Sequence, residues 1–160
     1  MPSNNSRRHR IAPDLEVASV VTVDIKGDTG FGPYDLEVDC IYNVMTERYE
    51  VTNLSAHAWG GIDAPGISSV GLRQIPMQEI VRRHAQPHVR GVDDGWVPAT
   101  MKRARPKSDA EYRDAAREYV AARIIGDPPL ERIAHVYQVS KATATRIAAE
   151  ARRRGFSTDG

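Results

Sequence analysis

The chain has 160 residues, of which 41% are hydrophobic and 27% charged, and its formal net charge is +1. This composition is typical of a globular protein with one domain or two small ones. No run of about eighteen apolar residues could span a membrane, and the polar, basic residues 1–10 lack the apolar core of a signal peptide, so we expect a cytoplasmic protein.

The charges are distributed unevenly along the chain. Residues 1–10 carry three arginines and no acid, residues 11–99 carry six basic and thirteen acidic groups, and residues 100–160 carry thirteen basic and eight acidic groups. The phosphates of nucleic acid repel acidic surfaces and attract basic ones. The middle of the chain is therefore expected to avoid nucleic acid, and the C-terminal part to attract it.

Three stretches rich in alternating Val, Ile and other apolar residues predict β-strands at residues 15–25, 34–45 and 48–59. Residues 26–33 contain three glycines and a proline, as a hairpin loop would. The connections are too short for crossover helices, so we expect a three-stranded antiparallel meander. Cys40, the one cysteine, has no disulfide or zinc-binding partner and is interpreted as a small buried apolar residue.

A short helix is predicted from Pro76 onward, because Met77, Ile80, Val81 and His84 fall on one helical face. This helix would cover the sheet and complete an N-terminal domain at residues 14–86. Residues 1–13 are interpreted as a flexible basic arm, suited to the minor groove of DNA or to solubility. Residues 87–107, with three prolines and two glycines, are interpreted as a linker.

The C-terminal part begins with a helix start signal at Ser108, since Glu111 three residues later completes a capping box. Gly126, followed by Asp-Pro-Pro, ends the pattern and predicts a helix of about seventeen residues. Its packing face is expected to consist of Tyr112, Ala115, Ala116, Tyr119 and Val120.

Two further helices joined by a short turn are predicted within residues 130–155. Val139 is expected to plug the turn and Ser140 to cap the last helix. Ala134 is small, as two closely crossing helices require. The residues expected to face inward are Leu130, Ile133, Ala134, Tyr137, Ala144, Ile147 and Ala148.

Residues 139–155 read VSKATATRIAAEARRRG. Together with the preceding helices, residues 108–156 resemble the helix-turn-helix DNA-binding domains of bacterial and phage regulators, particularly an actinobacterial form. The resemblance implies a recognition helix from about Lys141 to Arg153 that enters the major groove. One departure is Gln138, which stands where many members of the family have glycine and would need a left-handed backbone at a cost of about 1 kcal/mol.

The resemblance also implies the residues that contact DNA. The arginine Arg146 can donate two hydrogen bonds to guanine, Thr145 can meet a base or phosphate, and Ala142 offers a methyl contact to thymine. Residues at the start of the helix and the three arginines at its end suit phosphate contacts. The expected DNA-binding residues are Ser140, Lys141, Ala142, Thr145, Arg146, Ala149, Arg152, Arg153 and Arg154.

These patterns together predict an α+β protein with an N-terminal β-meander and one short helix, followed by a three-helix helix-turn-helix domain. We interpret it as a sequence-specific DNA-binding protein, a transcriptional regulator of actinobacterial or phage type, with no enzymatic activity and no cofactor or metal. A homodimer through the N-terminal domain is expected, because a single module of this kind binds weakly.

Two alternatives remain open at this point. The first is an interaction or scaffold protein whose N-terminal domain binds a partner protein. The second is an enzyme acting on DNA, in which Asp35, Glu37 and Asp39 would hold a metal ion, although an alternating acidic row is ordinarily a solvated face. The pair His84 and His88 has the spacing of helical metal ligands, but Pro87 between them disfavours a continuous helix.

Overall fold

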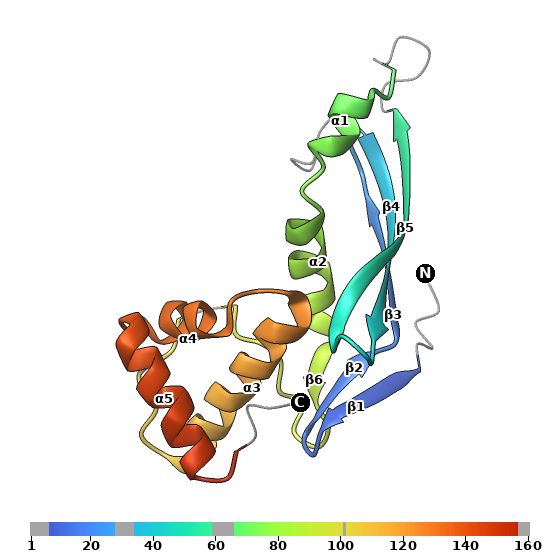
Figure 1. Cartoon of the computed structure of the whole chain (residues 1–160). Helices are drawn as coiled ribbons and strands as arrows, with labels where there is room; N and C mark the ends of the chain where they lie inside the picture. The colour runs from blue at the N-terminus through green and yellow to red at the C-terminus, as the bar shows by residue number, and fades with distance from the viewer. Residues whose placement is uncertain (1–6, 28–33, 59–65, 101, 157–160) are drawn as a thin grey trace.

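The computed structural model describes residues 7–27, 34–58, 66–100 and 102–156, and these form an α+β chain (Figure 1). The strands are β1 (Arg8–Ala12), β2 (Leu15–Ala18), β3 (Val20–Ile25), β4 (Tyr34–Asn43), β5 (Arg48–Ala58) and β6 (Val89–Gly91). The helices are α1 (Ser69–Arg73), α2 (Met77–Ala85), the 3-10 turn η2 (Gln86–His88), α3 (Asp109–Ile125), α4 (Pro129–Tyr137) and α5 (Lys141–Arg153). None of the helices in these described residues is long and apolar enough to cross a membrane.

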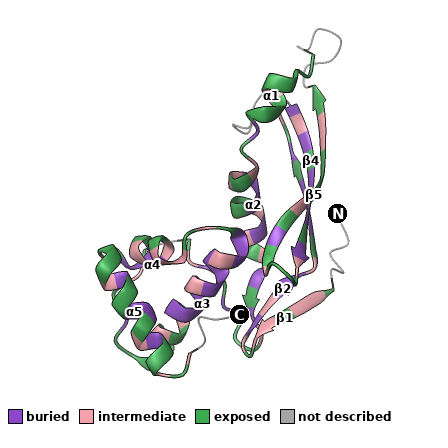
Figure 2. Cartoon of the chain, in the orientation of Figure 1, coloured by how far each residue is buried: buried purple, intermediate pink, exposed green. Residues whose placement is uncertain are grey.

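The strands form two antiparallel sheets, with the strand orders β1-β2-β6 and β3-β4-β5. Alternation in β3 and β4 buries every second side chain, including Val38 and Cys40, while their neighbours face outward. Figure 2 shows buried residues in the strands and in the helices α2 and α3. The loop predicted at residues 26–33 and the end of the third predicted strand at Trp59 lie largely outside the described residues.

The first predicted strand, residues 15–25, is wrong as a single element. The chain leaves one sheet and enters the other at Ser19, which separates β2 from β3. The Ser19 N–H donates to the Arg7 carbonyl oxygen at 2.7 Å, and the Ser19 carbonyl accepts from Tyr42 N–H at 2.9 Å. Ser19 thus hydrogen-bonds to Arg7, next to β1 of one sheet, and to Tyr42 in β4 of the other sheet. The unbroken alternation of residues 15–25 contains no sign of this change of sheet.

The flexible arm expected at residues 1–13 is wrong for residues 8–12, which form β1. Pro13 and Asp14 turn the chain so that β1 pairs with β2, and Ile11 and Ala12 pack against the core. Arg8 forms an ion pair with Glu16 on the neighbouring strand at 2.9 Å. Residues 1–6 of the expected arm lie outside the described part of the chain.

The linker expected at residues 87–107 is also wrong in part, because β6 lies within it and pairs with β2. Val89 is fully buried and Trp96 is 8% exposed, and both belong to the same core as the strands. Farther along, the Arg103 N–H donates to the Val136 carbonyl of α4 at 2.7 Å. The segment between the sheets and the helices is therefore packed against both.

The helix predicted from Pro76 is present as α2, with Pro76 at its N-cap, and it buries Ile80, Val81 and Ala85 against the sheets. His88 has left this helix and lies in η2. A shorter helix, α1, precedes it and was not predicted. Its Ser68 side chain caps the Gly71 N–H at 3.0 Å, yet none of its residues is buried.

Two apolar clusters form the core, and α3 contributes to both. Val120, Ala121, Ile124 and Ile125 lie among the strand and α2 residues, whereas Ala115 lies among α4 and α5 residues. The capping box at Ser108 and Glu111 starts α3 as predicted, and Gly126 ends it with φ of 82°. The expected division into two domains joined by a linker thus gives way to two cores that share one helix.

Candidate nucleic-acid interface

The turn between α4 and α5 is formed by three residues with complementary roles. Gln138 ends α4 in the left-handed region, with φ of 52° and ψ of 48°, as expected from its place in the sequence. The Val139 N–H then donates to the Ala134 carbonyl at 3.0 Å. Ser140 starts α5, and its hydroxyl accepts from the Thr143 N–H at 3.2 Å. Local bonds thus fix the angle at which α5 leaves the turn.

The Gln138 backbone provides a direct test of this turn. The left-handed penalty of about 1–2 kcal/mol exceeds the extra unfolded-state freedom of glycine, about 0.5–1 kcal/mol. Gln138→Gly is therefore expected to raise the free energy of unfolding by roughly 0.5–1 kcal/mol, measured by urea denaturation. Gln138→Ala is the matched control and should give no such gain, because it keeps the β-carbon.

A small apolar cluster holds the three helices together. It consists of Ala115 from α3, Ile133, Val136 and Tyr137 from α4, and Ala144 and Ile147 from α5. Val136 was not predicted to face inward, whereas Leu130 and Ala134, which were, are only partly buried. The packing leaves the opposite side of α5 uncovered by the helices that precede it.

This uncovered side of α5 carries every residue that the sequence assigned to base contacts. Lys141, Ala142, Thr145, Arg146 and Ala149 are all exposed, while Ala144, Ile147 and Ala148 are buried. The Thr145 hydroxyl donates to the Lys141 carbonyl at 3.0 Å, so its oxygen can still accept a bond from a ligand. Arg146 makes no hydrogen bond or ion pair within the described part of the chain.

The basic residues at the two ends of α5 differ in whether they already pair with acidic side chains of the chain itself. Lys141 lies 3.3 Å from Glu131, and both side chains are exposed, so this ion pair is weak and can be exchanged for a phosphate. Arg153 forms a two-pronged pair with Glu150, at 2.6 and 2.7 Å. Arg152 is exposed and has no partner among the residues that the structure describes.

Arg154 differs most from the expectation of a free phosphate contact. It bonds Glu150 at 2.7 Å and Asp109 at 2.5 Å, and its guanidinium lies 4.2 Å from the centre of the Tyr112 ring. Hydrogen bonds from Arg153 and Arg154 lower the pKa of Glu150 to about 2. Arg154 therefore fastens the end of α5 to the start of α3, and Arg152 is left as the most available of the three arginines.

Further basic groups, which no sequence pattern indicated, lie beside α4. Arg82 and Arg83 of α2 line a groove of about 590 Å³ together with Lys102 and His135. Glu79 pairs with both arginines, and bonding to Arg83 and Arg82 lowers its pKa. Arg82 and His135 lie far apart in sequence, with Lys102 between them, so only the fold could bring them together.

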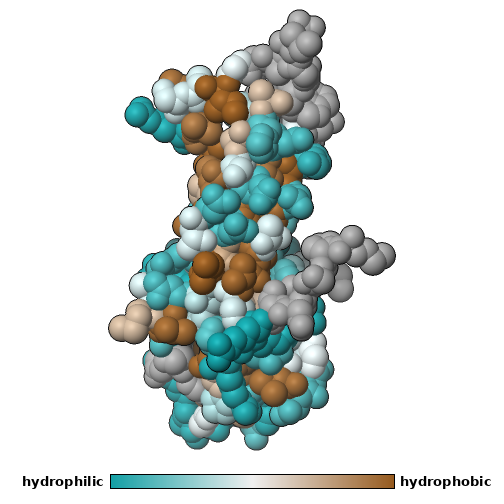
Figure 3. Space-filling view, turned by 90° about the vertical axis from the view of Figure 1, so that its right-hand side faces the viewer, coloured by the Kyte–Doolittle hydropathy of each residue, from teal (hydrophilic) through white to brown (hydrophobic). Residues whose placement is uncertain are grey.

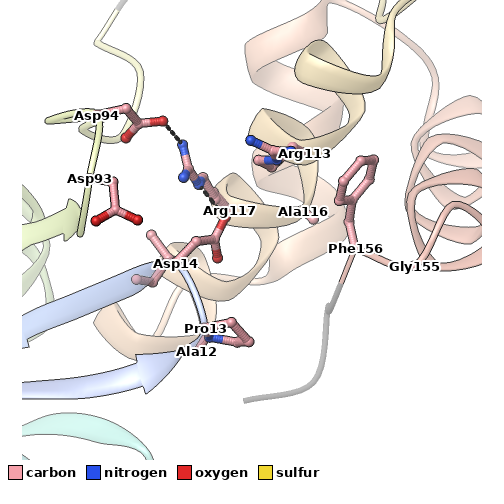
Figure 4. Close-up of a pocket in the computed structure, with 11 residues that line it drawn as sticks. Ala12, Pro13, Asp14, Asp93, Asp94, Arg113, Ala116, Arg117, Gly155 and Phe156 are labelled. Atoms are coloured by element: carbon pink, nitrogen blue, oxygen red, sulfur yellow. Dashed lines mark hydrogen bonds and ion pairs between the residues drawn. The ribbon is translucent and has the colours of Figure 1, made fainter.

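The helical unit is attached to the sheets by a buried arginine, Arg117 of α3 (Figure 4). Its Nε donates to Asp14 at 2.8 Å and its Nη1 to Asp94 at 2.6 Å, and its guanidinium packs over Trp96. Its hydrogen bond is the main reason why the pKa of Asp94 is lowered. A cavity of about 380 Å³ opens beside this junction, between the β1–β2 turn and Phe156. The ion pairs fix the position of α3, and through it that of α5.

The acidic row considered for metal binding lies on the outer face of β4. Asp35 accepts from the Gly27 N–H at 2.7 Å, and Asp39 accepts from the Thr22 hydroxyl at 2.7 Å. Among the described residues, no three His, Cys, Asp or Glu side chains come together as a metal ion would require.

Comparison with known proteins adds no assignment, since no family model, no curated protein and no solved structure matches this chain.

Proposed function

We propose that this protein binds double-stranded DNA through α5 and acts as a sequence-specific transcriptional regulator. The observation that carries the proposal is the exposed side of α5, where Arg146 has no acidic partner within the described residues and stands beside Thr145 and Ala142. Such a helix fits the major groove, and an arginine with free donors can bond the O6 and N7 atoms of guanine.

In this proposal α4, the turn and α5 act as a helix-turn-helix unit, and α3 supports it. Lys141 and Arg152 contact phosphates on either side of the base-reading residues, and Ser140 presents the start of α5 to the backbone. Support also comes from the charge distribution, since residues 100–160 carry thirteen basic and eight acidic groups. Phosphate contacts would supply most of the affinity, and Arg146 most of the sequence preference.

Arg146→Ala is expected to weaken binding to the preferred DNA site by about 1–3 kcal/mol, which is roughly five- to 150-fold, and to relax the preference at one base pair. The site is first found by selecting bound duplexes from a random library. Affinity is then measured by fluorescence anisotropy at several salt concentrations. Arg152→Ala should instead weaken binding to all sequences. It should also lower the slope of log affinity against log salt concentration by about one, the contribution of one phosphate contact.

Arg73→Ala is the matched control, because Arg73 is an exposed arginine of α1 far along the chain from α5. It should leave affinity and salt dependence unchanged. The absence of any DNA binding at low salt would contradict the proposal. An equal loss of DNA affinity in Arg73→Ala and Arg146→Ala would contradict it as well.

A protein partner is the second candidate function, and a specific surface favours it. Val20 and Ile41 pair across β3 and β4 and are 39% and 40% exposed, and Val44 and Met45 follow in the next turn. Exposed apolar groups that lie together are typical of protein-binding surfaces. A chain that binds no DNA at low salt would point to this function.

A further inference from the structure

Most of β5, and the segment that leads into α1 together with most of that helix, carry no Asp, Glu, Lys or Arg. Residues 51–58 and 66–72 contain no Asp, Glu, Lys or Arg. We call these residues the uncharged strip. Its two parts meet at the end of β5, because Gly71 of α1 packs directly on the Tyr34 hydroxyl and Tyr34 pairs with Ala58, the last residue of that strand.

The uncharged strip is also apolar where it is exposed. Its exposed large side chains are Leu54 at 36%, Leu72 at 39%, Ile67 at 41% and Val70 at 61%. Figure 3 shows hydrophobic surface at the upper end of the molecule, the end that carries α1 in Figure 1. A short helix is normally stabilised by burying an apolar face, yet α1 buries none of its residues. This helix therefore leaves Val70 and Leu72 largely uncovered in the chain as described.

The backbone beside this surface is open as well. β5 is the last strand of its sheet and, at 11 residues, is the longest strand described. Natural sheets protect such edges with lysine, proline or inward-pointing charges. The strip has neither lysine nor proline, and its bulge at Thr52 lies at one end. The remaining residues, 53–58, present an edge that another chain can approach.

We propose that the occupant of the uncharged strip is a second copy of this chain, related by a two-fold axis. Residues 11–99 carry thirteen acidic and six basic groups, so two copies repel each other over most of this part of the surface. The outer face of the same sheet exposes Asp24 directly opposite Glu37. The strip lets two copies meet without placing like charges together, and a two-fold contact uses the same patch twice.

A dimer formed in this way has a consequence for DNA that rests on the proposed function. The strip lies at the end of the molecule with α1, away from α5, so both copies of α5 stay uncovered (Figure 1). Two recognition helices related by a two-fold axis fit an inverted repeat whose half-sites are one helical turn, about 34 Å, or a multiple of it apart.

The test is the oligomeric state of the full chain without DNA, measured by sedimentation equilibrium. The unaltered protein is expected to be a dimer, and Leu54→Lys to raise its dissociation constant at least about tenfold. Ile41→Lys is the matched control, because Ile41 is 40% exposed on the outer face and Leu54 is 36% exposed on the strip. Ile41→Lys should leave the dimer intact.

Val70→Glu is a second variant at the strip, and it should separate the dimer without unfolding the chain, since Val70 is 61% exposed. Circular dichroism checks the fold of each variant. A monomeric unaltered protein would overturn the proposal, and so would a dimer that Ile41→Lys breaks and Leu54→Lys does not. Because DNA is absent, these outcomes are separate from any failure of DNA binding.

Discussion

Arg132→Met is expected to lower the free energy of unfolding by about 3–5 kcal/mol, because it leaves a buried carboxylate without its cation. Glu118 of α3 is fully buried, and its Oε2 accepts from the Arg132 Nε at 3.0 Å. Its Oε1 accepts from the Ala99 N–H at 2.5 Å, and the Arg132 Nη2 donates to the Ala99 carbonyl at 2.6 Å. This triangle joins α3, α4 and the segment before α3.

Urea denaturation measures this loss, and a second variant identifies its cause. Glu118→Leu combined with Arg132→Met removes both charges, and should be much more stable than Arg132→Met alone. Arg146→Met is the control for removing an arginine, and a change within about 0.5 kcal/mol is expected because Arg146 is exposed and unpaired among the described residues. A loss below about 1 kcal/mol for Arg132→Met would show that the carboxylate is not held as described.

Local signals predicted much of the helical part. Ser108 with Glu111, Gly126 and Ser140 all act on backbone groups within a few residues of themselves, and each ends or begins a helix as expected. The inward side of α5, with Ala144, Ile147 and Ala148, follows from helical periodicity, and Arg146 lies on the opposite, exposed side. Local signals of this kind require no knowledge of the tertiary fold.

The features that the sequence did not reveal depend on partners far along the chain. β1 and β6 are short, and each becomes a strand only by pairing with β2. Arg117 resembles any other charged residue of α3 until Asp14, 103 positions away, is placed beside it. Arg154 is similar, because Asp109 lies 45 positions away. Whether a basic residue is free for DNA or already paired is decided by the fold.

The shared helix α3 leads to the second large prediction. Ile124→Ala is expected to lower the free energy of unfolding by about 2–5 kcal/mol. The Ile124 side chain is 1% exposed within the cluster that joins α3 to the strands, so its removal leaves a cavity. Ile133→Ala should cost a similar amount in the other cluster, where Ile133 is fully buried. The two sites test whether the cores unfold together.

Both variants should lower the temperature of one and the same transition in scanning calorimetry, with the calorimetric enthalpy equal to the van't Hoff enthalpy. The physical reason is that α3 cannot unfold in one core and remain intact in the other, since Ala115 and Ile124 lie on the same helix. Two transitions, each shifted by only one of the variants, would instead indicate independent domains. A shared transition means that the sheets hold α3, and with it α5, in the position from which Arg146 would meet DNA.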